Sequence, residues 1–235
     1  MQKWKQAWQI AKFELSVSVK RFVFGSIPVV FFASLLIISF HDYLNSSFIL
    51  YDVFFIIFFT GGLYYRYPDH LQSRQQWNFV PWLKMQLPLP IQQEILIKSR
   101  FIIHFCFSFP VQIAFLIIFY VASPIANLLS IPAYISFAII WLSVNFYLGT
   151  SVPISEVYQT NRMVTVAIII VMLFIFLFIL SGSHLITDHG VVELSIIVAK
   201  KWPLTASGIS LIIGLAAVKA HQVYMKKFLN QLDYL

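Results

Sequence analysis

The chain has 235 residues, of which 60% are hydrophobic and only 11% are charged. Soluble globular domains carry about 25% charged residues, so this composition excludes an ordinary water-soluble domain and favours a membrane protein. A helix that crosses a bilayer needs roughly 20 apolar residues, so six such helices would fill about half of the chain and leave no room for a separate soluble domain.

Residues 1–21 are predicted to form an amphipathic interfacial helix. Apolar and small residues in and just after this segment recur with the spacing of one helical face: Trp4, Ala7, Trp8, Ala11, Leu15 and Phe22. Basic and amide residues take the remaining positions: Lys3, Lys5, Gln6, Gln9 and Lys12. A basic amphipathic helix with Trp on its apolar side is typical of a helix lying among lipid headgroups. A helix packed on a soluble partner is the alternative.

Six stretches with few or no charged residues predict an all-α, polytopic membrane protein with six transmembrane helices. They lie at about 22–40, 48–65, 101–122, 131–150, 164–181 and 203–219. Asp52 is the sole charge within the second stretch and lies near its outer end, where we expect the carboxylate to reach headgroups or water. Residues 191–198 are apolar but too short to cross, so they predict a small helix at the outer leaflet.

The positions of Lys and Arg predict the orientation. Fourteen of the 16 lie on one side of the six predicted spans, and only Lys200 and Lys201 lie on the other. The positive-inside rule therefore predicts a multi-pass protein of the cytoplasmic membrane with both termini inside. Nucleic acid is not an expected partner, because it would require a basic patch on a folded soluble surface.

Motifs of catalysis and cofactor binding are absent from the sequence. Neither GxxxxGK[ST], GxGxxG nor HExxH occurs, and His184 and His189 with Asp188 are the nearest approach to a metal cluster. Ser207 precedes a glycine as in intramembrane serine proteases, but His221, the only later histidine, lies about 20 Å further along the same helix. The chain is therefore not expected to be an enzyme or to hold a cofactor or metal.

Two polar residues within the predicted spans have a simpler explanation than transport chemistry. His104 and Asn145 each lie in an apolar stretch, where a polar side chain usually finds a partner on another helix. We expect both to make interhelical hydrogen bonds.

The longest predicted inner loop, residues 66–100, combines aromatic, proline and charged residues. Trp77, Phe79 and Trp82 lie close to Lys84, and the run Leu-Pro-Leu-Pro at 87–90 follows. Such an apolar protrusion is costly in water unless it rests on lipid headgroups or on another protein. Both remain possible from composition, and we favour a protein partner. A second, shorter inner loop carries Glu156.

This layout resembles bacterial ATP-binding-cassette (ABC) transporter permeases of the type-2 exporter superfamily. The motif of the resemblance is Leu87-Pro88, then Glu94-Ile95, then Lys98 at the start of the third span. The resemblance implies that residues 1–235 form one transmembrane permease domain without its own ATPase. Its partners would be cytoplasmic nucleotide-binding ATPase subunits, which hold ATP and Mg, and a second permease copy or a related permease.

In such a permease the loop 66–100 would be the element that couples to the ATPase. The residues implied in this contact are Trp77, Phe79, Trp82, Lys84, Glu94, Lys98 and, as a lesser contact, Glu156. The spans are rich in Phe and nearly free of charge, which favours export of a hydrophobic or amphipathic cargo such as a peptide, lipid or drug. The alternative is a non-transporting membrane immunity or regulatory protein that binds a cytoplasmic partner through the same loop.

Overall fold

The computed structural model of the protein describes residues 2–46, 48–60, 91–155, 178, 180–182 and 184–232. These residues form helices and connecting turns, without strands. The elements are α1 (Gln2–Ile38), α2 (Phe40–Ser46), α3 (Ile49–Phe59), α5 (Gln93–Ala122), α6 (Ile125–Leu128), α7 (Ile131–Val144), the π-helix η2 (Asn145–Gly149), α8 (Ser151–Ser155), α10 (Val191–Lys201) and α11 (Pro203–Leu232). The fold class expected from composition, all-α, is therefore confirmed for the described residues.

Three helical segments in this part of the chain are long and apolar enough to cross a membrane. They are Gln93–Ala122, Ile131–Ile154 and Pro203–Asn230, with 30, 24 and 28 residues. They correspond to the third, fourth and sixth predicted spans. A fourth crossing is possible by length if Ser26–Ile38 and Phe40–Ser46, which are bent by 44°, act as one span. Membrane association thus follows from length and composition.

The count of six spans stays a prediction. The helix α3 covers 11 residues of the predicted second span, about 17 Å at helical rise, which is too short to cross alone. Residues 61–65 of that span and 164–177 of the predicted fifth span lie outside the described residues.

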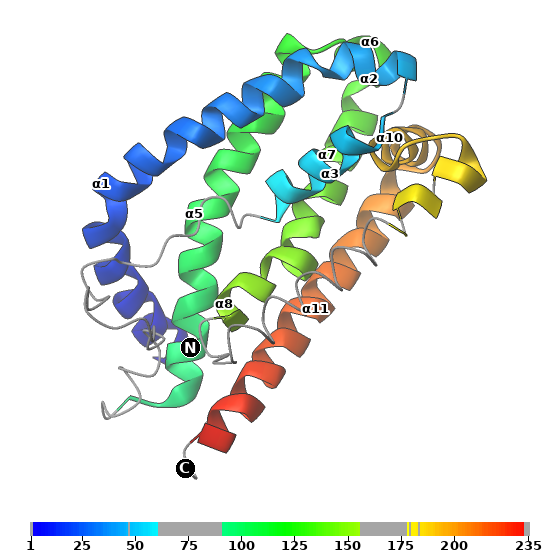
Figure 1. Ribbon diagram of the computed structural model, residues 1–235. Helices are drawn as coiled ribbons and strands as arrows, with labels where there is room; N and C mark the ends of the chain where they lie inside the picture. The colour runs from blue at the N-terminus through cyan, green and yellow to red at the C-terminus, as the bar shows by residue number, and fades with distance from the viewer. Residues whose placement is uncertain are drawn as a thin grey trace.

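The predicted boundary between an interfacial helix at 1–21 and a first span at 22–40 is absent. A single helix, α1, runs through both segments and contains Pro28. The polar first half is built from Lys, Gln, Ala and Glu, which are strong helix formers, so a change from polar to apolar composition does not break the helix. A proline inside a helix removes one backbone hydrogen bond and can kink the helix without ending it. Figure 1 shows α1 changing direction along its length.

The helix bundle has two ends that carry different elements. Figure 1 shows both chain termini at one end of the bundle, which we call the terminal end, and α2, α6 and α10 at the opposite, distal end. Helix α1 packs along α5, and α11 packs along α7 and η2. The outward side of α11 is apolar and exposed, through Leu204, Ile209, Ile212, Ile213 and Leu215.

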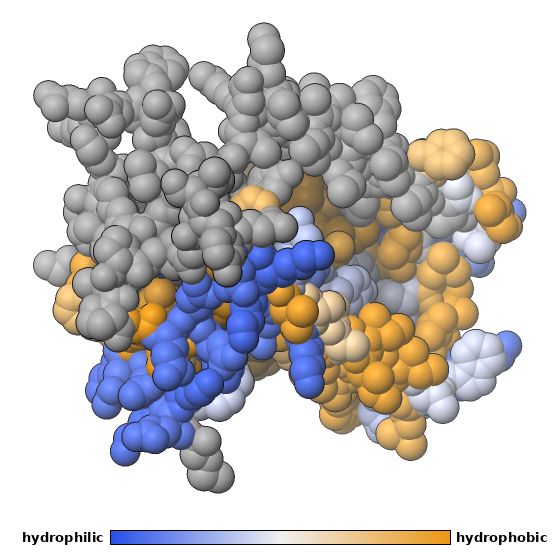
Figure 2. All heavy atoms as spheres, turned by 90° about the horizontal axis from the view of Figure 1, so that it is seen from below, coloured by the Kyte–Doolittle hydropathy of each residue, from blue (hydrophilic) through white to orange (hydrophobic). Residues whose placement is uncertain are grey.

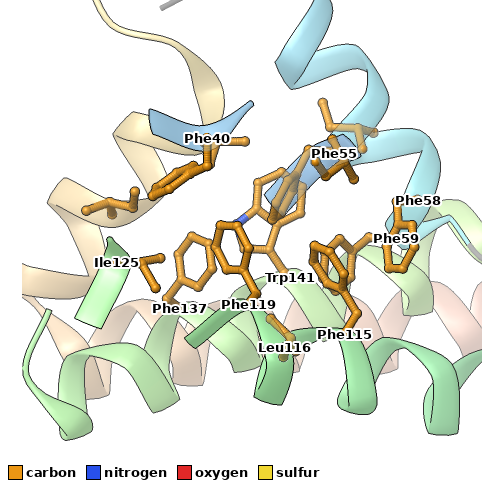
Figure 3. Packing of buried hydrophobic residues seen from close by; sticks show 14 of the residues in the cluster. Phe40, Phe55, Phe58, Phe59, Phe115, Leu116, Phe119, Ile125, Phe137 and Trp141 are labelled. Atoms are coloured by element: carbon orange, nitrogen blue, oxygen red, sulfur yellow. The ribbon is translucent and has the colours of Figure 1, made fainter. Parts of the chain in front are cut away.

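An aromatic core joins α3, α5 and α7 near the distal end. Phe55 lies at its centre, with its ring centroid 4.6 Å from that of Trp141 and 5.7 Å from that of Phe119. Phe59, Phe115 and Phe137 complete this cluster (Figure 3). Several of the ring pairs meet edge to face, the arrangement that aromatic quadrupoles favour. We refer to this cluster as the aromatic core.

Candidate coupling site and buried polar contacts

Two of the predicted coupling residues, Glu94 and Lys98, lie in the described structure. Both are on the first two turns of α5, which begins at Gln93 immediately after the extended residue Gln92. The other five, Trp77, Phe79, Trp82, Lys84 and Glu156, lie outside the described residues. The two residues described precede the charge-free part of α5 at 101–122, so they lie beyond the segment expected in the hydrocarbon.

Glu94 connects three helices at the terminal end. Its Oε2 accepts a hydrogen bond from Lys3 Nζ of α1 at 2.7 Å, and its Oε1 accepts one from Lys226 Nζ of α11, also at 2.7 Å. Figure 2 looks onto this end and shows hydrophilic residues gathered between apolar flanks. We call these three residues the Glu94 clamp.

The two lysines keep the Glu94 carboxylate charged. Hydrogen bonds from Lys226 and Lys3, followed by their positive charges, lower the pKa of Glu94 to about 2. Because this pKa is depressed, the contribution of the clamp to stability is complete above about pH 4.5, the ordinary value, and is lost only as the pH falls through about 2. The clamp therefore stays intact throughout the physiological pH range, while its exposure makes it sensitive to salt.

Lys98 contacts α1 instead of a carboxylate. Its Nζ lies 5.1 Å from the centroid of the Trp4 ring, within the range of a cation–π contact. Glu94 and Lys98 thus both make contacts within the chain. A contact of either residue with an ATPase stays a prediction.

A buried ion pair holds α1 against α5 two residues after Lys98. Arg100 donates from Nη1 and Nη2 to the two carboxylate oxygens of Glu14, with 2.7 Å between Nη1 and Oε2. The side chains are only 2% and 9% exposed. The sequence pattern does not predict this pair, because the two residues are 86 positions apart in the chain. Glu14 lies seven residues after Ala7 and three after Ala11, on the same buried side of α1. This helical spacing is the one sequence signal that indicates the burial of Glu14.

A network of buried polar side chains continues along α5. Ser108 and Gln112 follow His104 at successive turns, and all three face Asn145 of η2. Asn145 Oδ1 lies 2.8 Å from His104 Nε2, and Asn145 Nδ2 donates to Ser108 Oγ at 2.7 Å and to Gln112 Oε1 at 3.1 Å. Gln112 in turn donates to the carbonyl oxygen of Phe59. The predicted interhelical hydrogen bonds of His104 and Asn145 are confirmed.

Asp52 is not an exposed interfacial residue, contrary to the sequence interpretation. Its side chain is fully buried at the distal end. Tyr43 Oη donates to its Oδ1 at 2.7 Å, and the backbone N–H groups of Val191 and Val192 donate at 3.0 and 2.9 Å. His184 Nε2 lies 2.8 Å from Oδ2. A buried carboxylate is costly unless donors satisfy it, and these groups replace the water that the sequence interpretation had assumed.

The predicted small helix at 191–198 is present as α10, which extends to Lys201. His184 and His189 contact different carboxylates, since His189 pairs with Glu193 at 2.9 Å. Within the described residues, no group of three or more His, Cys, Asp or Glu side chains could hold a metal ion.

Comparisons with known protein families, curated proteins and solved structures found no match to this chain.

Proposed function

We propose that this chain is the membrane-spanning permease subunit of an ATP-driven ABC exporter. Three lines support the proposal: helices of spanning length and apolarity, the sequence motif at 87–98, and the position of Glu94 within that motif. Its partners would be cytoplasmic nucleotide-binding subunits that hydrolyse ATP, and a second permease, either identical or related. The membrane would be the bacterial cytoplasmic membrane, with both termini inside.

The observation that carries the proposal is the Glu94 clamp. Glu94 lies where the predicted coupling loop joins α5, and it binds Lys3 of α1 and Lys226 of α11 at the same time. A displacement of the loop by a partner would therefore pull on three helices together. A few residues further along, the Arg100–Glu14 pair fixes α1 to α5 inside the bundle, so the two helices would move as one body.

The composition of the spans points to the cargo. Asp52, Glu14 and Arg100 are buried but occupied by partners within the chain. The buried polar side chains of His104, Ser108, Gln112 and Asn145 hydrogen-bond to one another, and aromatic and aliphatic side chains form the large core cluster near the distal end. A hydrophobic or amphipathic cargo such as a peptide, lipid or drug suits this interior better than a small ion, which would require polar groups to replace its hydration shell.

The test is co-purification from the native membrane in mild detergent. Tagged wild-type protein should retain an ATPase subunit, with ATP turnover in the purified complex. Glu94→Ala combined with Trp82→Ala should reduce retention or ATP turnover by about tenfold. Asp42→Ala, which removes an exposed acidic side chain of α2 at the distal end, is the matched control and should leave both unchanged.

The proposal is wrong if no ATPase accompanies the wild-type protein. If a partner without ATPase activity is retained through the same residues, the protein instead belongs to the immunity or regulatory class. If the ATPase is retained and Glu94→Ala with Trp82→Ala has no effect, the exporter assignment stands and the coupling role of this loop does not.

A further inference from the structure

The N-terminus of α10 is capped by a residue from another helix. The residue before α10, Gly190, offers no side chain to its first turn. Asp52 of α3 supplies the missing acceptor and takes the N–H groups of Val191 and Val192, from a position about 140 residues away in sequence. A carboxylate at a helix N-terminus also interacts favourably with the helix dipole. This contact fixes α10 to α3 at the distal end.

The close approach of the two helices requires a glycine at 190. A Cβ added there would lie 2.0 Å from Tyr43 Oη and 2.7 Å from Asp52 Oδ2. Both distances are far below van der Waals contact, so any side chain would displace Asp52 or Tyr43. The capping contact therefore depends on Gly190 as well as on Asp52.

Helix α10 closes the aromatic core at the distal end. Val192, Ile196 and Ala199 point inward and belong to the same buried cluster as Phe55 and Trp141. Ser195 Oγ accepts a hydrogen bond from Trp141 Nε1 at 3.0 Å. Removing α10 would expose the aromatic side chains beneath it.

Both ends of α10 adjoin residues that are not helical. Asp188, before the helix, has a left-handed φ of 56°, and Gly190 is extended. Trp202, with φ −137° and ψ 65°, is the only residue between α10 and α11. Non-helical residues at element ends are the positions where hinge rotation is absorbed. A rotation of α10 would therefore be absorbed at Trp202 and at the residues before Val191.

We propose that Asp52 is a positioning residue that latches α10 shut over the aromatic core. Release of the latch opens this core at the distal face. The aromatic surface exposed in this way fits an apolar or amphipathic molecule, which would be the cargo leaving the protein; this last step rests on the proposed exporter function, whereas the latch does not.

The latch is tested by cysteine accessibility in the full chain, reconstituted in lipid nanodiscs without any ATPase. In a Cys106→Ala background, Ala199→Cys places one thiol on the buried side of α10, where Ala199 has 0% exposure. Adding Asp52→Asn should raise the rate of labelling by a water-soluble maleimide at least tenfold. Gly190→Ala should do the same, because its Cβ would displace Tyr43 Oη, which donates to Asp52, and would crowd the capping carboxylate.

Two controls separate the latch from general loss of structure. Ala11→Cys reports on an equally buried position at the terminal end, and its labelling rate should not respond to Asp52→Asn. Gly208→Ala adds a Cβ that meets nothing within 4 Å and should leave the Ala199→Cys rate unchanged. Equal acceleration at both reporters, or no acceleration at Ala199→Cys with either variant, would overturn the latch.

The gating role is tested separately in the complex with its ATPase. With Asp52 intact, labelling of Ala199→Cys should accelerate when ATP is hydrolysed. If Asp52→Asn accelerates the labelling of Ala199→Cys but ATP turnover does not, the role of α10 in cargo release is wrong. The exporter assignment is then decided by co-purification.

Discussion

At the scale of single residues, the two acidic side chains at opposite ends of the bundle are stabilised by different means. Glu94 is partly exposed and forms ion pairs with two flexible lysines, so water and salt screen these interactions. Asp52 is fully buried and accepts from a tyrosine hydroxyl and two backbone N–H groups, whose positions are set by the fold. Preorganised donors in a low-dielectric interior contribute more per bond than mobile surface pairs. Substitution of Asp52 should therefore disturb the protein more than substitution of Glu94.

Gly149 offers a sharper test of packing at one residue. A Cβ at this position would lie 2.0 Å from Asn145 Oδ1 and 2.5 Å from the carbonyl oxygen of Thr60. Gly149→Ala should therefore lower the free energy of unfolding by about 2–3 kcal/mol, as overpacking of a tight interior does. The measurement is denaturant unfolding of the purified protein in mixed micelles.

Gly208 provides the control for this substitution. Its added Cβ would meet no heavy atom within 4 Å, and the residue lies inside α11. Gly208→Ala should raise stability by about 0.5–1 kcal/mol, since alanine loses less conformational entropy than glycine in a helix. Similar destabilisation by both alanines would show that the close approach at Gly149 does not exist.

At the scale of elements, the seam between α1 and α5 combines small residues with one charged pair. Ala7 and Ala11 are fully buried, which allows the two helix backbones to approach closely. Trp4 and Trp8, which the sequence pattern placed on the same face, are 53% and 47% exposed at its flank. The two tryptophan side chains can therefore contact lipid headgroups, while the two alanines pack against α5.

The Arg100–Glu14 pair in this seam should behave as a buried ion pair. Arg100→Met alone leaves the Glu14 carboxylate buried without its main partner and should cost about 3–5 kcal/mol. The double variant Arg100→Met with Glu14→Leu should recover most of this loss, because an apolar pair of similar volume needs no compensating charge. Unfolding of both singles and the double measures the coupling. Additive losses would contradict a direct pair.

The elements that sequence analysis located correctly are those whose signal is local. Charge-free runs placed α5 and α11, and a short apolar run placed α10, because length and hydropathy are read from neighbouring residues. The burial of Asp52 and the pairing of Glu14 with Arg100 could not be read in this way. Their partners are distant in sequence, and a charge near the end of an apolar run looks the same whether water or a backbone N–H satisfies it. Of the candidate site, the sequence pattern placed Glu94 in the inner loop 66–100, whereas the structure places it in the first turn of α5. The pattern gave no sign of Lys3 and Lys226 as its partners.

At the scale of the whole molecule, the described lysines gather mainly at one end of the bundle. The terminal end carries Lys3, Lys5, Lys12, Lys98, Lys226 and Lys227, and the distal end carries Lys200 and Lys201 beside Trp202. The positive-inside rule predicts that the terminal end faces the cytoplasm.

This orientation is tested by labelling intact cells with a membrane-impermeant maleimide. In a Cys106→Ala background, Lys200→Cys should react from outside, and Lys227→Cys should react only after the cells are permeabilised. Both lysines are exposed, so neither thiol needs a conformational change to react. The reverse pattern would invert the protein and place the Glu94 clamp outside the cell, where no ATPase subunit could reach it.

The charge-free parts of α5 and α11 differ in length, and this difference affects the surrounding lipid. The charge-free part of α5, residues 101–122, is about 33 Å long, and that of α11, residues 203–218, is about 24 Å long. The hydrocarbon of a bilayer is about 30 Å thick, so the lipid beside α11 must thin, or Lys219 must extend toward the headgroups. Because the apolar side of α11 faces outward, the mismatch falls on lipid and not on protein. If the lipid thins beside α11, the activity of the protein should be higher in bilayers with shorter acyl chains; if Lys219 extends to the headgroups, the activity should not depend on chain length.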